Sequence, residues 1–211
     1  NRILYVTIEN GHQELPAECI PILRDNSVTN FMKLGLGTLS VSDDLTLYEG
    51  DITVHEGTYS FTTNAALGKL SNLAGTIYVD DGATLDYDPQ SAASGWYTRR
   101  IVFGGSGVNG IGALTFTGNA SNSRMCFGSN LVMRADALIR NKQNNQGPAL
   151  HQTGGAYPIW LDMNGHTLTF AGGIIVWGNL NVLNPGHFIV SNVNFTVTGS
   201  KSNFGGGPEN T

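Results

Sequence analysis

The 211-residue sequence is poor in cysteine, in charge and in long apolar runs, and each scarcity excludes a class of protein. Its two cysteines, Cys19 and Cys126, are too few for a disulfide-stapled scaffold, so we expect buried, unpaired thiols, with a Cys19–Cys126 bridge as the alternative. Charged residues make up 13%, and the net charge of −5 disfavours nucleic acid as a partner. No apolar run is long enough to cross a bilayer as a helix, so we expect no membrane span.

Helical patterning is also scarce, because no stretch repeats its apolar residues every 3.6 positions between capping residues. What the sequence does contain is 28 glycines and 40% hydrophobic residues, with asparagine, serine and threonine supplying most of the remaining polarity. This composition is typical of short strands joined by tight turns, and it is too apolar for a disordered chain.

One short pattern recurs along the chain: a glycine, a small or polar residue, and then two apolar residues separated by one position. Copies begin at Gly37, Gly57, Gly75, Gly112 and Gly186, and a copy with one extra residue begins at Gly165. The alternation is that of a strand with one face turned inward, and the glycine fits the corner where the chain enters that strand. Gly37 and Gly57 are 20 residues apart, and Gly57 and Gly75 are 18 apart.

A period near 20 residues is typical of one rung of a solenoid. The sequence therefore predicts an all-β fold, a right-handed parallel β-helix, with a β-sandwich as the alternative. Equivalent motif positions should then form inward stacks, one of Leu39, Tyr59 and Ile77 and the next of Val41, Phe61 and Val79. Further strands are predicted at 45–47, 52–54, 84–87, 174–177, 180–183 and 193–197.

The chain reads as a single domain with an N-terminal cap at 1–30, rungs at 31–200 and a flexible tail at 201–211. Two polar, glycine- and asparagine-rich excursions, 88–100 and 141–160, are predicted to be long loops between rungs. Because the chain begins at Asn1 and Val193–Val197 still alternates near its end, we interpret it as a fragment of a larger extracellular protein. An unfinished coil end would expose unpaired backbone groups, so self-association through the coil ends is expected.

The stretch Lys33-Leu34-Gly35-Leu36-Gly37-Thr38-Leu39, followed by Tyr48-Glu49-Gly50, Val54 and Glu56-Gly57-Thr58, resembles the autotransporter-associated β-strand repeat. The segments 104–114 and 161–168 also resemble the β-helical passenger domains of autotransporters. The resemblance covers about residues 31–200, and it implies a bacterial protein that is secreted or displayed on the cell surface, with some relatives acting as adhesins. A C-terminal membrane barrel, which complete autotransporters carry, is missing from this sequence.

Candidate chemistry is sparse. Asp43-Asp44 and Asp80-Asp81 are predicted to lie at equivalent corners about two rungs apart, where they could hold Ca²⁺, but turn capping is the favoured interpretation. A glycosidase needs two facing carboxylates, which the acidic residues Glu49, Glu56, Asp86 and Asp88 cannot be shown to provide, since they are expected at solvated turns or outer faces. The five histidines have no zinc-like spacing. We therefore assign no catalytic residue, metal site or cofactor.

Aromatic and arginine side chains gather at the two predicted loops: Trp96, Tyr97, Arg99, Arg100, Tyr157 and Trp160. Aromatic faces beside arginine suit sugar stacking and contacts with carboxylates, so a polysaccharide or cell-surface glycan is the predicted ligand. The alternative is that these side chains pack the loops onto the coil. The sequence favours a non-enzymatic stalk, surface-display or adhesin-like domain, with a carbohydrate-binding accessory module of a polysaccharide-degrading protein as the alternative.

Overall fold

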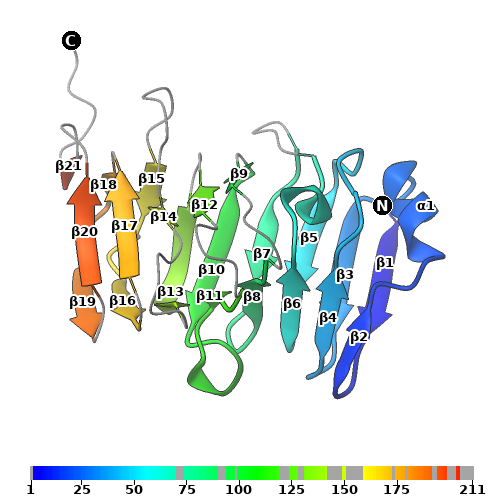
Figure 1. Cartoon of the computed structure of the whole chain (residues 1–211), viewed down its shortest axis with the longest axis horizontal. Helices are drawn as coiled ribbons and strands as arrows, with labels where there is room; N and C mark the ends of the chain where they lie inside the picture. The colour runs from blue at the N-terminus through cyan, green and yellow to red at the C-terminus, as the bar shows by residue number, and fades with distance from the viewer. Residues whose placement is uncertain are drawn as a thin grey trace, which may run out of the picture.

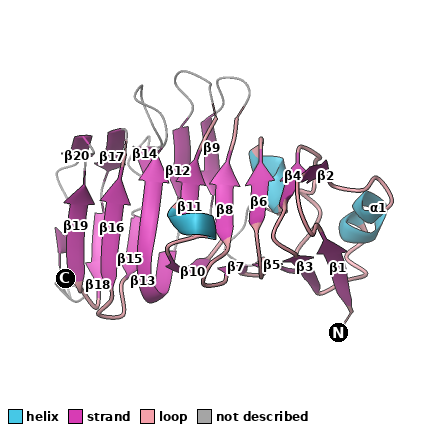
Figure 2. Ribbon diagram, turned by 90° about the horizontal axis from the view of Figure 1, so that it is seen from below, coloured by secondary structure: helices cyan, strands magenta, loops and turns pink. Residues whose placement is uncertain are grey.

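The computed structural model describes residues 2–69, 74–89, 94–97, 99–118, 124–127, 131–141, 149–150, 159–172, 174–178, 180–191, 194–198 and 203–204. Over these residues the fold is all-β apart from short helical turns, and it forms a long parallel sheet that curls along the molecule (Figures 1 and 2). The helical segments are α1 (Cys19–Arg24), η1 (Asn64–Leu67) and η2 (Val108–Gly110). All strand pairs among the described residues are parallel.

Three rows of stacked strands account for this pairing. The first row is formed by β1 (Ile3–Thr7), β3 (Asn30–Leu34), β5 (Asp51–Val54), β7 (Ile77–Val79), β10 (Ile101–Gly105), the start of β13 (Leu131–Asn141), β15 (Ile159–Asp162), β18 (Leu180–Leu183) and β21 (Asn203–Phe204). The second row is formed by β2 (His12–Glu14), β4 (Thr38–Val41), β6 (Thr58–Phe61), β8 (Thr84–Tyr87), β11 (Leu114–Phe116), the end of β13, β16 (Thr167–Ala171) and β19 (His187–Ser191). The third row contains the pair β9 (Ser94–Tyr97) and β12 (Arg124–Phe127) and the group β14 (Ala149–Leu150), β17 (Ile174–Gly178) and β20 (Asn194–Thr198).

The chain advances one position along each row before it returns, which is the arrangement a solenoid requires. The number of residues between register partners in successive rungs is not constant. Leu39 pairs with Tyr59 after 20 residues, as the sequence period predicts, but Ile77 pairs with Ile101 after 24 and Ile101 with Leu131 after 30. The middle rungs are longer because they add third-row strands and turns to the two strands that the motif marks.

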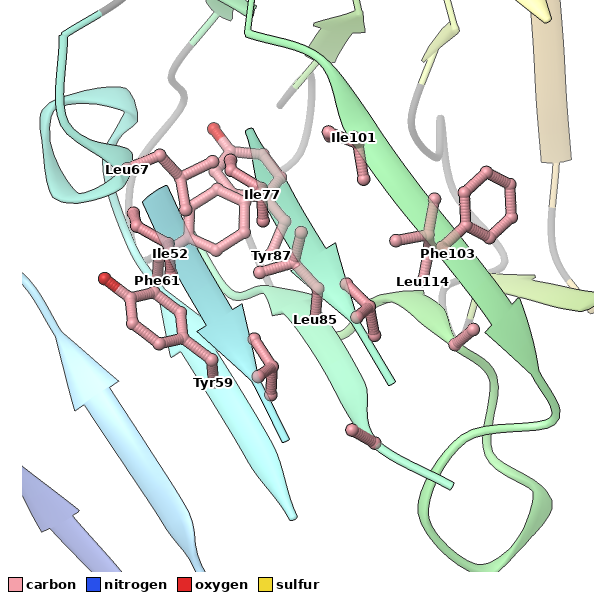
Figure 3. Packing of buried hydrophobic residues seen from close by; sticks show 14 of the residues in the cluster. Ile52, Tyr59, Phe61, Leu67, Ile77, Leu85, Tyr87, Ile101, Phe103 and Leu114 are labelled. Carbon is pink, nitrogen blue, oxygen red and sulfur yellow. The ribbon is translucent and has the colours of Figure 1, made fainter. Parts of the chain in front are cut away.

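The predicted inward stack of Leu39, Tyr59 and Ile77 is wrong at its third member. In the second row Tyr59 pairs with Leu85, whereas Ile77 lies in the first row between Ile52 and Ile101. Figure 3 shows Ile77 and Leu85 on different strands of the buried cluster. The stack of Val41 and Phe61 likewise continues with Tyr87 instead of Val79. The glycine motif marks the entry to a strand in either row, so counting motif copies does not identify the row.

Two other local predictions differ from the structure. The stretch 45–47 is a turn, because the Asp44 carboxylate accepts hydrogen bonds from the Thr46 N–H at 2.9 Å and the Thr46 hydroxyl at 2.6 Å. The predicted loops 88–100 and 141–160 contain β9 and β14, and β15 begins inside the second one. The rest of these two excursions falls largely outside the described residues, as does nearly all of the tail 201–211.

The core lies between the rows and consists of columns of apolar side chains (Figure 3). The first-row column contains Phe31, Ile52, Ile77, Ile101, Leu131, Leu161 and Val182, all of them buried. At one end of the molecule lies α1, with Cys19 and Leu23 buried (Figure 1). At the other end, β19 pairs only with β16 among the described strands, and Ile189 and Val190 are 48% and 50% exposed. No helix in the described part of the chain has the length and hydropathy needed to cross a membrane.

Candidate functional site

The structure describes the side chains of three of the six residues that the sequence grouped as a glycan site. Trp96 and Tyr97 form part of β9, but their side chains are outside the described part of the structure, as is Tyr157 altogether. Arg99 is buried, Arg100 is exposed, and Trp160 in β15 is half-buried. The prediction that all six residues bind a glycan remains a prediction, and two of the six, Arg100 and Trp160, lie together.

Arg100 and Trp160 line the same outer pocket, a depression of about 200 Å³. Its other lining residues are Leu131, Val132, Asp162 and Leu183. Arg100 directly precedes Ile101, and Trp160 directly precedes Leu161. Ile101 and Leu161 both pair with Leu131, so Arg100, just before β10, and Trp160, in β15, occupy equivalent positions two steps apart along the first row. The sequence placed them on two different loops because it could not show that the register aligns them.

Asp162 is a member of this pocket that the sequence did not identify. Its Oδ1 accepts a hydrogen bond from the Asn164 N–H at 3.1 Å and another from the Asn184 side-chain amide at 2.9 Å. Asn164 and Asn184 both have positive φ, which asparagine tolerates better than most residues. The Asp162 carboxylate is therefore held in place by the turn that follows each strand, and it borders the pocket at a fixed position.

Arg99, the neighbour of Arg100, points into the molecule and is 1% exposed. Its Nε donates to the Gly75 carbonyl and its Nη1 to the Leu67 carbonyl, both at 2.8 Å, and its Nη2 donates to the Gly50 carbonyl. Burial lowers the pKa of the guanidinium. The Arg99 guanidinium thus holds three chain segments, those before β5, at the end of η1 and before β7, and it is turned away from any ligand in the outer pocket.

Lys33 is a second buried cation and belongs to the resemblance motif. Its side chain is 0% exposed, and its Nζ donates to the carbonyls of Gly35, Gly37 (2.5 Å) and Glu56 (2.9 Å). Burial lowers the Lys33 pKa to about 8. The Glu56 carboxylate, in turn, accepts a hydrogen bond from the Gly35 N–H at 3.0 Å. These contacts tie the corner after β3 to the corner after β5.

Gly57 completes this corner. It has a φ of +65°, and a Cβ at this position would lie 2.4 Å from the Gly37 carbonyl oxygen and 2.5 Å from that of Gly35. Those oxygens accept the hydrogen bonds of Lys33, so the glycine gives the chain room to pass over them. The lysine and glycine positions of the motif therefore serve the same contact between neighbouring rungs.

The acidic corner pairs are not equivalent, which corrects the sequence prediction. Asp80 follows β7 in the first row, whereas Asp43-Asp44 follows β4 in the second. The Asp80 carboxylate lies 2.6 Å from His55 Nδ1 and accepts a hydrogen bond of 2.6 Å from the Arg134 guanidinium. Burial alone would raise the Asp80 pKa, but these hydrogen bonds lower it overall.

The remaining candidate groups show no arrangement for binding or catalysis within the described residues. Asp86, expected to be solvated, is buried, and its carboxylate accepts hydrogen bonds from the hydroxyls of Ser60 (3.3 Å), Thr115 and Thr117 (both 2.6 Å). Cys19 is a free, buried thiol whose pKa is raised by burial, and the Cys126 side chain is not described. Within the described ranges, no three His, Cys, Asp or Glu side chains are placed to hold a metal ion.

Comparison of the chain with models of protein families, with curated proteins and with solved structures gives no match.

Proposed function

We propose that this chain is a non-enzymatic structural domain of an extracellular bacterial protein, a right-handed parallel β-helix that acts as a stalk or surface-display element. The observation that carries the proposal is the continuous parallel ladder of the first row, which runs from β1 to β21. Each strand in such a row satisfies its backbone against its neighbours, and the apolar column beneath it continues from rung to rung. A chain of this kind resists bending and local opening, which are the properties required of a spacer.

The buried polar groups support the same proposal. Lys33 and Arg99 use their charges to bind backbone carbonyls of successive rungs, and Asp86 does the same with hydroxyls. Lysine, arginine and aspartate can all serve in catalysis, but Lys33, Arg99 and Asp86 form hydrogen bonds that connect neighbouring rungs. The resemblance to the autotransporter-associated repeat supports export to the cell surface, and an adhesin-like role is part of the proposal.

Protease resistance on the surface of a cell tests the stalk function. The chain would be placed between a bacterial membrane anchor and a terminal epitope, and intact cells would be treated with proteinase K. A Gly/Ser linker of equal length serves as the control. We expect the epitope to stay attached at protease concentrations that release it from the linker. Release at the same rate from both carriers would contradict the proposal.

A further inference from the structure

The outer pocket at Arg100 and Trp160 combines three kinds of recognition group on a fixed part of the sheet. Because side chains alternate along a strand, and Ile101 and Leu161 face the core, Arg100 and Trp160 face outward. Neighbouring strands are about 4.8 Å apart, so two steps separate the two backbone positions by roughly 10 Å. Asp162 lies two residues beyond Trp160, on the same side of β15.

The chemistry of these groups restricts the ligand. The half-buried Trp160 indole offers an apolar face for a flat or chair-shaped ring, and Val132 and Leu183 add apolar surface. Arg100 offers donors in a fork that fits a carboxylate. Asp162 offers a carboxylate whose Oδ1 already has two donors, which leaves acceptor capacity for ligand hydroxyls.

We propose that this pocket binds an acidic saccharide, with a sugar ring stacked on Trp160, its carboxylate on Arg100 and ring hydroxyls on Asp162. A purely apolar ligand would desolvate Arg100 and Asp162 without replacing their hydrogen bonds. A simple cation would be repelled by Arg100, and a simple anion would gain nothing from the indole face. The small volume suits a single ring of a longer polymer, because pockets that enclose a drug-sized ligand measure about 300–1,000 Å³.

The polymer would run along the stacking direction of the strands. Arg100 and Trp160 are aligned along the first row, and the same outer position continues on β18 as Asn181, the register partner of Trp160. An oligosaccharide that follows this line can contact Arg100, Trp160 and Asn181 at once. This inference goes beyond a stalk function, and its failure would leave the protease-resistance test of the stalk unaffected.

Calorimetric titration with a galacturonic acid tetrasaccharide tests the proposal, with cellotetraose as the neutral probe. The variants are Trp160→Ala and Arg100→Gln, and the matched controls are Tyr5→Ala and Arg2→Gln. The controls remove an exposed aromatic ring and an exposed positive charge at the far end of the molecule. Circular dichroism of each variant confirms that the fold is retained.

We expect saturable binding of the acidic probe, weakened at least tenfold by Trp160→Ala and by Arg100→Gln and unchanged in both controls. Binding of the acidic probe should also weaken as salt is raised, because salt screens the Arg100 contact. The proposal is overturned if neither probe binds, if the folded Trp160→Ala and Arg100→Gln proteins bind as the unaltered chain does, or if cellotetraose binds as tightly as the acidic probe.

Discussion

At the scale of single residues, the structure depends on two buried cations, Lys33 and Arg99, that donate hydrogen bonds to backbone carbonyls. Each of them donates hydrogen bonds to three backbone carbonyls, all distant in the chain for Arg99, and for Lys33 two nearby ones and that of Glu56 in the next rung. The Gly37 carbonyl also accepts the Thr58 N–H, but those of Gly35 and Glu56 depend on Lys33, and an unsatisfied buried acceptor costs about 1–3 kcal/mol. The cation repays part of its own desolvation by satisfying several of them at once.

Lys33 makes the free energy of unfolding depend on pH in a predictable direction. Its pKa in the folded chain is about 8, against 10.5 for an ordinary lysine. Between these values the unfolded chain holds a proton that the folded chain has released, so this group makes unfolding less favourable as pH rises. We expect Lys33→Met to lose this rise between pH 8 and 10. At pH 7 it should be destabilised by about 3 kcal/mol, since the buried carbonyls of Gly35 and Glu56 lose their donor and that of Gly37 keeps only the Thr58 N–H.

Urea denaturation of the two proteins at a series of pH values measures this difference. Lys69→Met is the matched control, because Lys69 is exposed and pairs with Glu49 at the surface. An exposed ion pair contributes about 0–1 kcal/mol, so this variant should keep the pH dependence of the unaltered chain. Parallel pH curves for the Lys33→Met protein and the unaltered chain would show that Lys33 has no such effect.

At the scale of strands, the structure is governed by which row each strand joins. The column of Val41, Phe61 and Tyr87 runs through β4, β6 and β8, and the Phe61 and Tyr87 rings lie 5.1 Å apart, centroid to centroid. Phe61 is fully buried, which confirms that it faces inward. The alternation identified the buried face correctly in the copies that begin at Gly37, Gly57, Gly75, Gly112 and Gly165, whereas in the copy at Gly186 Val190 is half exposed. The spacing between copies did not identify the neighbouring strand.

Replacing Phe61 with alanine should destabilise the chain by about 3–5 kcal/mol, because it removes a fully buried ring and leaves a cavity beside Tyr87. Leu47→Ala is the control, since Leu47 is 62% exposed and should contribute less than about 0.5 kcal/mol. Thermal and urea denaturation measure both. Equal midpoints for the two variants would mean that Phe61 does not support the column.

At the scale of the whole molecule, the two ends differ. The end that carries β1 has α1 against it, with Leu23 fully buried (Figure 2). At the opposite end, Val190 continues the inward column of Phe170 but is half exposed, and β19 has one strand partner within the described part of the chain. An apolar edge strand is a site for pairing with another chain.

We expect the chain to self-associate through the edge of β19, and we expect Val190→Lys to weaken this association by placing a charge at the end of the apolar column. Light scattering over a concentration series measures it. Leu47→Lys is the control, because it adds the same charge at an exposed position between β4 and β5, at the other end of the stack from β19. An unaltered chain that stays monomeric at every concentration would rule out this association.

The sequence by itself determined the local structure: the alternation and the corner glycines predict most of the strands, and the lack of helical periodicity predicts an all-β chain. These features are local, since alternation depends on adjacent residues and a corner depends on a single backbone conformation. Tertiary structure alone decided the row of each strand, because the row depends on the lengths of the intervening segments and on which columns pack together. It also decided the roles of two adjacent arginines. Arg99 turns inward to bind carbonyls and Arg100 turns outward beside Trp160, because successive residues face opposite sides and only the register of β10, β13 and β15 brings residues 100 and 160 into line.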